Sequence, residues 1–196
     1  VAGFYSDTYV DDVLMRAMDL ILAFPALVLA IAIIGAFGTE NLSYGPLTLT
    51  NQVKVILVVA IVYIPRLARV MRGSVISEME EDYVEAAEAA GGGSSYILTR
   101  EVMPNAMAPV IVQATLLMAT AVLAVAGLSF LGIGILPPKP SLGMMLSNSR
   151  DYVYSGAWWF SIIPGLMILT TIFGFNLLGD GLRDALDPKY ESRRRD

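Results

Sequence analysis

Between Glu101 and Lys139 the chain runs for 37 residues without a charged side chain, VMPNAMAPVIVQATLLMATAVLAVAGLSFLGIGILPP (102–138). A transmembrane α-helix needs about 20 consecutive apolar residues, so this stretch is long enough to cross a bilayer and continue into a loop. Each of its Leu, Ile, Val and Phe residues favours insertion by about 0.3 to 0.6 kcal/mol, and no charge opposes them. The stretch therefore predicts a transmembrane helix over about 105–130.

Three other apolar intervals have the same character and predict transmembrane helices over about 14–37, 52–71 and 157–178. The composition agrees, because 56% of the residues are hydrophobic and 16% are charged, against about 25% charged in soluble domains. A soluble helical bundle would need a polar face on each helix, and 105–130 and 157–178 have none. We therefore expect an all-α polytopic membrane protein, with one transmembrane domain over 1–196.

Two residue types are missing from the sequence, and this excludes several classes of site. There is no cysteine and no histidine, which removes disulfides, thiolate or imidazole metal sites, and Ser-His-Asp or Cys-His nucleophiles. No lysine follows a glycine, so the chain has no P-loop for ATP. No ionisable residue lies in the middle of a predicted span, whereas proton-coupled carriers need buried carboxylates or histidines. We expect no enzymatic chemistry, no cofactor and no bound metal.

Lysine and arginine are unequally divided between the two sides of the predicted spans. Ten lie on the side that holds both termini and the connection 73–103, and three lie on the other side. Because cytoplasmic loops carry an excess of Lys and Arg, the first side should be cytoplasmic and the connection 131–156 external.

The connection 73–103 contains the sequence EMEEDYVEAAEAAGGG (78–93). Its acidic residues suit the start of a helix, the following alanines are strong helix formers, and Gly91 can end the helix in a left-handed conformation. Ser94 or Ser95 can cap a second short helix to Met103, which Pro104 interrupts or restarts. The small side chains of the first helix allow a partner to approach closely, but an interfacial loop helix without a partner explains it equally well. They are Ala86, Ala87, Ala89 and Ala90.

This segment resembles the EAA loop of binding-protein-dependent ABC transporter permeases. The family pattern is Glu-Ala-Ala, three residues, Gly, nine residues, Ile-x-Leu-Pro, and the chain has EAAEAAG at 85–91 and EVMP at 101–104. Glu101 and Met103 depart from the apolar residues of the pattern. The resemblance implies a coupling helix that docks on an ATPase subunit. The contact residues would be Glu85, Ala86, Ala87, Gly91 and Pro104.

Two more stretches, AGLSFLGIG (126–134) and NLLGDGLRDALDP (176–188), are similar to the dipeptide/oligopeptide/nickel group of these permeases. That group usually has six spans, and the four predicted here correspond to the last four. We therefore expect the first two spans to be missing, and whether Val1 is a native start or a truncation stays open.

The resemblance implies a permease subunit of an ATP-driven ABC importer for peptides or nickel, in the cell membrane of a prokaryote, with both termini of this chain cytoplasmic. Its partners would be ATP-binding cassette ATPase subunits, a second permease of the same or another kind, an extracytoplasmic substrate-binding protein and the lipid bilayer, with no nucleic acid. A channel or carrier that acts alone and a structural membrane anchor are the alternatives, and co-purification of an ATPase separates them.

Polar and small residues in the spans allow two interpretations. Gln113, Ser129 and Asn176 are candidates for lining a translocation path, although Asn176 can equally form a hydrogen bond between helices. Thr115 and Ala119 form a small-xxx-small pair, which favours close packing of helices and explains this part of the span over 105–130 without a path.

Ser94→Cys and Ser147→Cys test the predicted orientation, because the 196 residues contain no cysteine. We expect an impermeant thiol reagent outside intact cells to label Ser147→Cys and to spare Ser94→Cys, which lies in the connection 73–103. Labelling of Ser94→Cys from outside would reverse the orientation.

Overall fold

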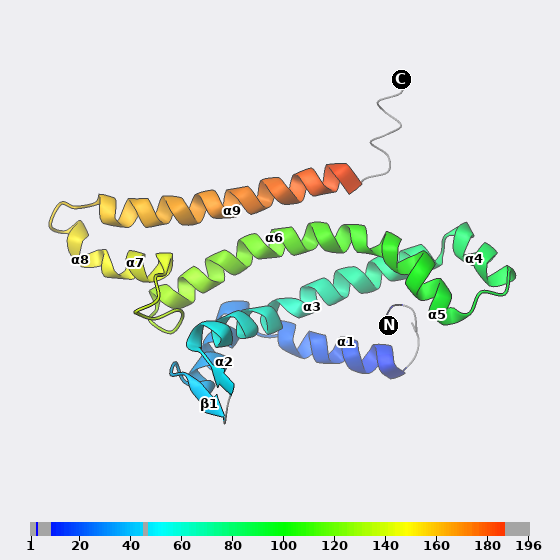
Figure 1. Ribbon diagram of the computed structural model, residues 1–196, viewed down its shortest axis with the longest axis horizontal. Coiled ribbons are helices and arrows are strands. Elements are labelled where there is room, and N and C mark those ends of the chain that lie inside the picture. Colours follow the sequence, from blue (N-terminus) through cyan, green and yellow to red (C-terminus); the bar gives the residue numbers. More distant parts are fainter. Residues whose placement is uncertain (1–2, 4–8, 45–46, 187–196) are drawn as a thin grey trace, which may run out of the picture. The chain divides into compact units, whose positions relative to one another are not determined.

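The computed structural model describes residues 3, 9–44 and 47–186 (Figure 1). Its secondary structure is helical apart from one antiparallel hairpin, β1 (Leu42–Tyr44) and β2 (Leu47–Leu49), in which Ser43 pairs with Thr48. This confirms the all-α class. Residues 187–196, which include the last two residues of the stretch 176–188, lie outside the described residues.

The three longest described helices are α3 (Asn51–Met79), α6 (Met103–Phe130) and α9 (Trp159–Leu186). All three pass through two compact units. Unit 1 consists of Val1–Ile21, Ile64–Leu116 and Leu177–Asp196, and unit 2 consists of Leu22–Tyr63 and Leu117–Asn176.

Two described helical stretches are long and apolar enough to cross a membrane, Ser94–Phe130 and Trp159–Leu186. A third span results if α1 (Tyr9–Leu22) and α2 (Ala26–Phe37) are counted together. The span predicted over 52–71 lies within α3 and stays a prediction.

The continuous helix expected over 14–37 is wrong, because α1 ends at Leu22 and α2 begins at Ala26. Pro25 is the cause: it has no N–H to donate, and its ring pushes the preceding residue out of the helical region. Its own backbone is extended, with φ −56° and ψ 128°, and its carbonyl accepts the Leu29 N–H at 3.0 Å as α2 starts.

The core of unit 2 forms where α2, α3 and α6 meet. Val55, Val58, Val59 and Val62 recur at the spacing of one helix face and are at most 6% exposed. They pack with Leu128 of α6, which is fully buried, and with Ala30 and Ile34 of α2.

Unit 2 also contains the tight turn that ends α6. The Leu128 carbonyl accepts the N–H groups of Ile133 at 3.1 Å and Gly134 at 2.9 Å. Ser129, which is fully buried, accepts the Ile135 N–H on Oγ at 3.0 Å. A Cβ on Gly134 would collide with the backbone of Ser129, so this turn requires a glycine for space.

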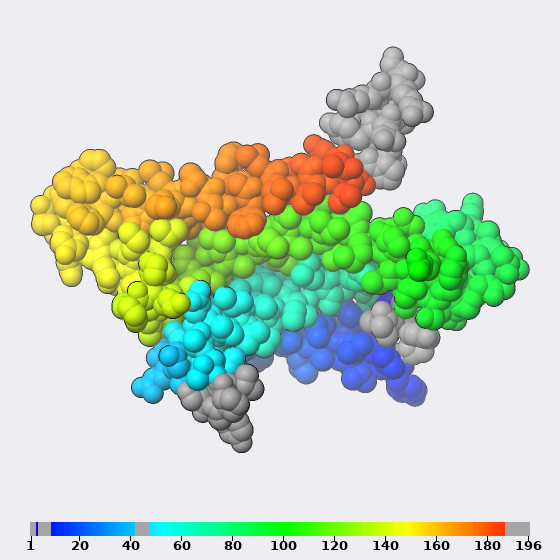
Figure 2. Space-filling view, viewed as in Figure 1, coloured from blue at the N-terminus to red at the C-terminus, as the bar shows by residue number. Residues whose placement is uncertain are grey.

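Two short helices, α7 (Leu142–Asn148) and α8 (Arg150–Val153), follow this turn and lead to α9. The Ser141 side chain makes no cap hydrogen bond at the start of α7. Figure 2 shows both short helices in yellow, continuous with the orange start of α9. A 2.6 Å hydrogen bond between the hydroxyls of Ser149 and Ser161 connects the end of α7 with the start of α9. Tyr152 of α8 stacks on Phe160 of α9, with ring centroids 5.0 Å apart.

In unit 1, two ion pairs hold α1 against α3. Arg72 donates to Asp11 through Nε at 2.9 Å and through Nη2 at 2.6 Å, and the Asp11 side chain is only 4% exposed. Arg69 pairs with Asp19 at 2.6 Å, with both side chains more than half exposed. The first pair matters more for stability, because a buried carboxylate without a partner is costly and an exposed pair contributes little.

Gly134→Ala should destabilise the protein, since the added Cβ has no space beside Ser129. Forcing a methyl group into such a contact costs about 1 to 3 kcal/mol, which lowers the Tm of the purified protein in detergent by several degrees. Gly165→Ala in α9 is the matched control, because nothing lies within 4 Å of its Cβ position. Equal melting temperatures for the two variants would contradict this account of the turn.

Candidate functional site

The segment that connects α3 with α6 begins where a run of acidic residues breaks the helix. After Met79 the chain turns, with the Glu81 N–H bonded to the Glu78 carbonyl at 3.2 Å, and α4 (Asp82–Ala89) starts from an extended Glu81. Negative charge is unfavourable at a helix C-terminus and favourable at a helix N-terminus. The same acidic cluster therefore favours both the end of α3 and the start of α4.

The end of α4 is a Schellman motif built on Gly91. The Gly91 N–H bonds the Glu88 carbonyl at 2.9 Å, and the Gly92 N–H bonds the Ala87 carbonyl at 3.0 Å. Gly91 has φ +85°, a conformation that costs a residue with a side chain about 1 kcal/mol or more. The left-handed Gly91 expected from the sequence is confirmed.

The second half of the segment differs from the expectation. The N-cap of α5 (Ser94–Tyr96) is Gly93, with no side-chain cap hydrogen bond, so the capping role predicted for Ser94 or Ser95 is wrong. The helix then continues through a π-helical turn, η1 (Ile97–Val102), directly into α6.

Pro104 explains the π-helical turn. Its ring would clash with the carbonyl four residues earlier in a regular α-helix. The wider turn before it avoids this, with the Met103 N–H bonded to the Leu98 carbonyl five residues back. The Glu101 carbonyl accepts the side-chain amide of Asn105 at 3.0 Å. Pro104 therefore changes the helix geometry without ending the helix.

One face of α4 is seated on an apolar cluster of unit 1. Val84 is 1% exposed and packs with Val75 of α3 and with residues of η1 and α6, and Ala87 packs against the same cluster. Ala87 therefore faces inward, in contrast to the outward alanine surface expected from the sequence. The cluster partners in η1 and α6 are Ile97, Val102 and Ala106. The exposed residues of the outer face are Glu85, Ala86, Glu88, Ala89 and, at its end, Ala90.

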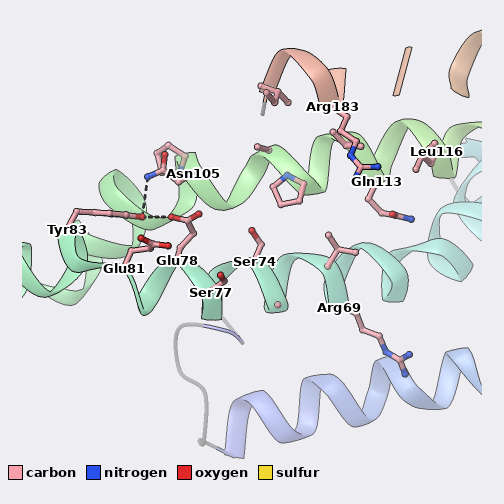
Figure 3. A pocket seen from close by; sticks show the side chains of 17 residues that line it. Arg69, Ser74, Ser77, Glu78, Glu81, Tyr83, Asn105, Gln113, Leu116 and Arg183 are labelled. Atoms are coloured by element: carbon pink, nitrogen blue, oxygen red, sulfur yellow. Dashed lines mark hydrogen bonds between the residues drawn. The ribbon is translucent and has the colours of Figure 1, made fainter. Parts of the chain in front are cut away.

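A cavity of about 1160 Å³ lies within unit 1, between α3, α6 and the end of α9 (Figure 3). Gln113 of α6 and Arg183 of α9 line it, and so does Pro104. Carboxylates and hydroxyls line it as well, so its wall carries both signs of charge. These further polar residues are Arg69, Ser74, Ser77, Glu78, Glu81, Tyr83 and Asn105.

At one end of this cavity Tyr83 joins three helices. Its hydroxyl donates to Glu78 Oε2 at 2.6 Å and accepts from Asn105 Nδ2 at 3.2 Å (Figure 3). Burial, and then the hydrogen bond to Glu78, raise the pKa of Tyr83, so the hydroxyl keeps its proton at neutral pH. Nothing in the local sequence around Glu78, Tyr83 and Asn105 indicates that the three side chains meet, so they were not predicted as a site.

The predicted path residues do not share one environment. Gln113 lines the cavity of unit 1, whereas Ser129 and Asn176 belong to unit 2. Ser129 is fully buried in the turn after α6, so the structure gives it a structural role there. Asn176 is half-buried on α9.

Thr115 serves packing within the chain. It is 5% exposed, and its Oγ1 would lie 2.6 Å from a Cβ on Gly179 of α9. Close packing of α6 on α9 therefore uses this small residue without a second subunit. In the described part of the chain, no three carboxylates gather as metal ligands.

The sequence matches one protein family over residues 1–192, described as "Binding-protein-dependent transport system inner membrane component". It is 43% identical over 192 residues to the "Di/tripeptide transport system permease protein DppC" of Pseudomonas aeruginosa, covering 98% of this chain and 59% of the relative. It is 42% identical over 179 residues to the "Dipeptide transport system permease protein DppC" of Escherichia coli K12, covering 91% of this chain and 56% of the relative. The chain thus spans less than two thirds of these curated relatives.

Ala87→Glu and Ala86→Glu should separate the two faces of α4. A carboxylate at residue 87 would be forced against the apolar cluster, which costs about 1 to 3 kcal/mol and lowers the Tm by several degrees. A carboxylate at residue 86 stays in water, so that variant should melt as the wild type does. The opposite ranking in thermal unfolding of the purified protein would place Ala86 inward.

Proposed function

Because the chain belongs to the binding-protein-dependent transport system inner membrane components, we propose that it is a permease subunit of an ATP-driven importer of peptides. The observation that carries the proposal is α4, a short helix with one face seated on an apolar cluster and the other exposed. It bears the EAA pattern at 85–87 and ends at the left-handed Gly91. The ATPase that supplies the energy would be a separate subunit.

Docking on the ATPase would use the exposed face of α4. Ala86 and Ala89 let another backbone approach closely, and Glu85 offers a carboxylate for hydrogen bonds or ion pairs at the rim. Force on this face would pass through Val84 and Ala87 into α3 and α6. Gly91 would let α4 tilt while the chain beyond it stays in place, and Pro104 would shape the helix that receives the movement.

Peptides are the substrate class that we propose, and nickel is not needed. The relatives in Pseudomonas aeruginosa and Escherichia coli are named for di/tripeptides and dipeptides. A peptide carries a cationic and an anionic end, and the cavity of unit 1 offers Arg183 for one end and Glu78 or Glu81 for the other. Gln113 would line the path there, and Asn176 is a second candidate. The burial of Ser129 argues against a direct contact with substrate.

The exposed surfaces and the charge distribution support the remaining partners that we propose. An extracytoplasmic binding protein would dock near 131–156, where α7 and α8 lie. α9 exposes an apolar face to the bilayer or a second permease, at Ile163, Leu166, Leu169 and Phe173. The cytoplasmic side would hold α4 and both ends of this chain, in the cell membrane of a prokaryote.

Gly91→Val and Glu85→Lys in the full-length protein, within the assembled transporter, test the coupling role. Both should lower peptide uptake and substrate-stimulated ATP hydrolysis together, because the first strains the hinge and the second reverses a charge on the docking face. Gly93→Val is the matched control, since Gly93 has φ −71°, which valine adopts, and nothing lies within 4 Å of its Cβ position.

Substrate binding to the extracytoplasmic protein should stay unchanged in every variant, because that site is on another chain. Wild-type uptake by Gly91→Val and Glu85→Lys, at equal abundance in the membrane, would remove the coupling assignment.

A further inference from the structure

We propose that Tyr83 is a positioning residue whose hydroxyl makes α4 move together with the inner ends of α3 and α6, so that displacement of α4 changes the cavity of unit 1. The inference rests on the proposed docking of α4 on an ATPase. It adds the side chain through which the docking helix acts on the cavity.

The hydroxyl of Tyr83 forms a hydrogen-bonded joint between three helices, α3, α4 and α6. Tyr83 lies in the first turn of α4, Glu78 in the last turn of α3, and Asn105 in the first turn of α6. The hydroxyl donates to the carboxylate at 2.6 Å and accepts the amide at 3.2 Å, so its hydrogen bonds reach both neighbouring helices. Asn105 is held in turn by the Glu101 carbonyl at 3.0 Å.

The apolar cluster under α4 cannot by itself make α4 move together with α3 and α6. Val84 and Ala87 hold α4 against the cluster, but apolar attraction has no preferred direction, and it allows the helix to slide or rotate on its seat. Hydrogen bonds have a narrow range of length and angle, and a bond to a carboxylate is stronger than one between neutral groups. Tyr83 therefore fixes the direction in which movement of α4 is passed on.

The other end of α4 is followed by three successive glycines, Gly91 to Gly93. A Cβ on Gly91 or Gly93 would meet nothing within 4 Å, whereas one on Gly92 would lie 2.8 Å from the Ala87 carbonyl oxygen. The backbone on either side of Gly92 therefore has room to bend. A push on the exposed face is therefore resisted at the Tyr83 end and accommodated at the glycine end. Such an arrangement directs the displacement of α4 to Tyr83 and its two hydrogen-bond partners.

The joint is also part of the cavity wall. Glu78, Tyr83 and Asn105 all line the cavity, together with Ser74 and Ser77 on the same face of α3 (Figure 3). A displacement of the Tyr83 hydroxyl must shift at least one of these lining groups or break its bond. Movement at the docking face thus reaches the cavity through this residue.

Tyr83→Phe in the full-length permease, assembled with its ATPase, tests the proposal. The ring and its packing are kept and only the hydroxyl is lost, so we expect ATP hydrolysis to continue while peptide uptake per ATP falls by about fivefold or more. Tyr96→Phe is the matched control, because Tyr96 lies on α5 and is 54% exposed. The control should keep the wild-type ratio.

A second measurement distinguishes positioning from a merely structural role. With Ser74→Cys as the only cysteine of the permease, the rate of thiol modification reports access to the cavity. We expect ATP to change this rate when Tyr83 is present and to leave it unchanged in Tyr83→Phe.

Asn105→Ala is the alternative variant if Tyr83→Phe does not reach the membrane. It removes the hydrogen bond between Tyr83 and α6 by deleting the amide of Asn105. Adding Asn105→Ala to Tyr83→Phe should cost little more than Tyr83→Phe alone, because both act on one joint.

The outcomes separate this inference from the proposed function. Loss of coupling in Glu85→Lys with a wild-type ratio and ATP response in Tyr83→Phe would overturn the inference and leave the docking of α4 intact. Wild-type coupling in both variants would remove the docking assignment and the inference with it. An equal loss in Tyr96→Phe would show that the effect is not specific to the joint and would also overturn the proposal.

Discussion

In a long uncharged segment that crosses a bilayer, the backbone must form its own hydrogen bonds, and most of the fold depends on this constraint. In a bilayer an unpaired N–H or C=O costs several kcal/mol, and a helix is how one continuous segment satisfies all of its groups internally. The 37 uncharged residues of 102–138 therefore contain all of α6, and the apolar stretch 157–178 supplies most of α9. The helix ends, turns and short helices of the structure occur where a continuous helix is interrupted.

Each of these helix breaks has an identifiable chemical cause. Pro25 separates α1 from α2, and the acidic run before Asp82 separates α3 from α4. Gly91 ends α4, and the turn at Gly134 ends α6 close to α7. Pro104 is the exception, because a π-helical turn absorbs it and the helix continues. The connection between α3 and α6 is thus a short helix between an acidic break and a glycine hinge, attached to a helix that runs on into the apolar region.

Several charged residues on which the predicted orientation rests also make contacts within the chain. Arg69 and Arg72 add to the positive charge on one side, yet the structure pairs them with Asp19 and Asp11 of α1. Lys54 is similarly used: it is 7% exposed, and its Nζ donates to the carbonyls of Gly38 and Glu40. The family relationship, the exposed face of α4 and the charged wall of the cavity support our proposal of a subunit that converts force on α4 into a change in a peptide path.

The sequence by itself determined what depends on neighbouring residues along the chain. Apolar runs predicted the helices around 105–130 and 157–178, the glycine after the alanine-rich helix predicted the left-handed Gly91, and the spacing of the EAA motif predicted the family. These properties follow from hydropathy, helix propensity and backbone conformation, which are local. Tertiary structure decided what depends on residues far apart in sequence: Arg72 meets Asp11 across 61 positions, and Asn105 meets Tyr83 across 22. Ala87 faces inward and Ser129 is buried for the same reason, because packing partners on other helices, and not the neighbouring residues, choose which side of a helix is covered.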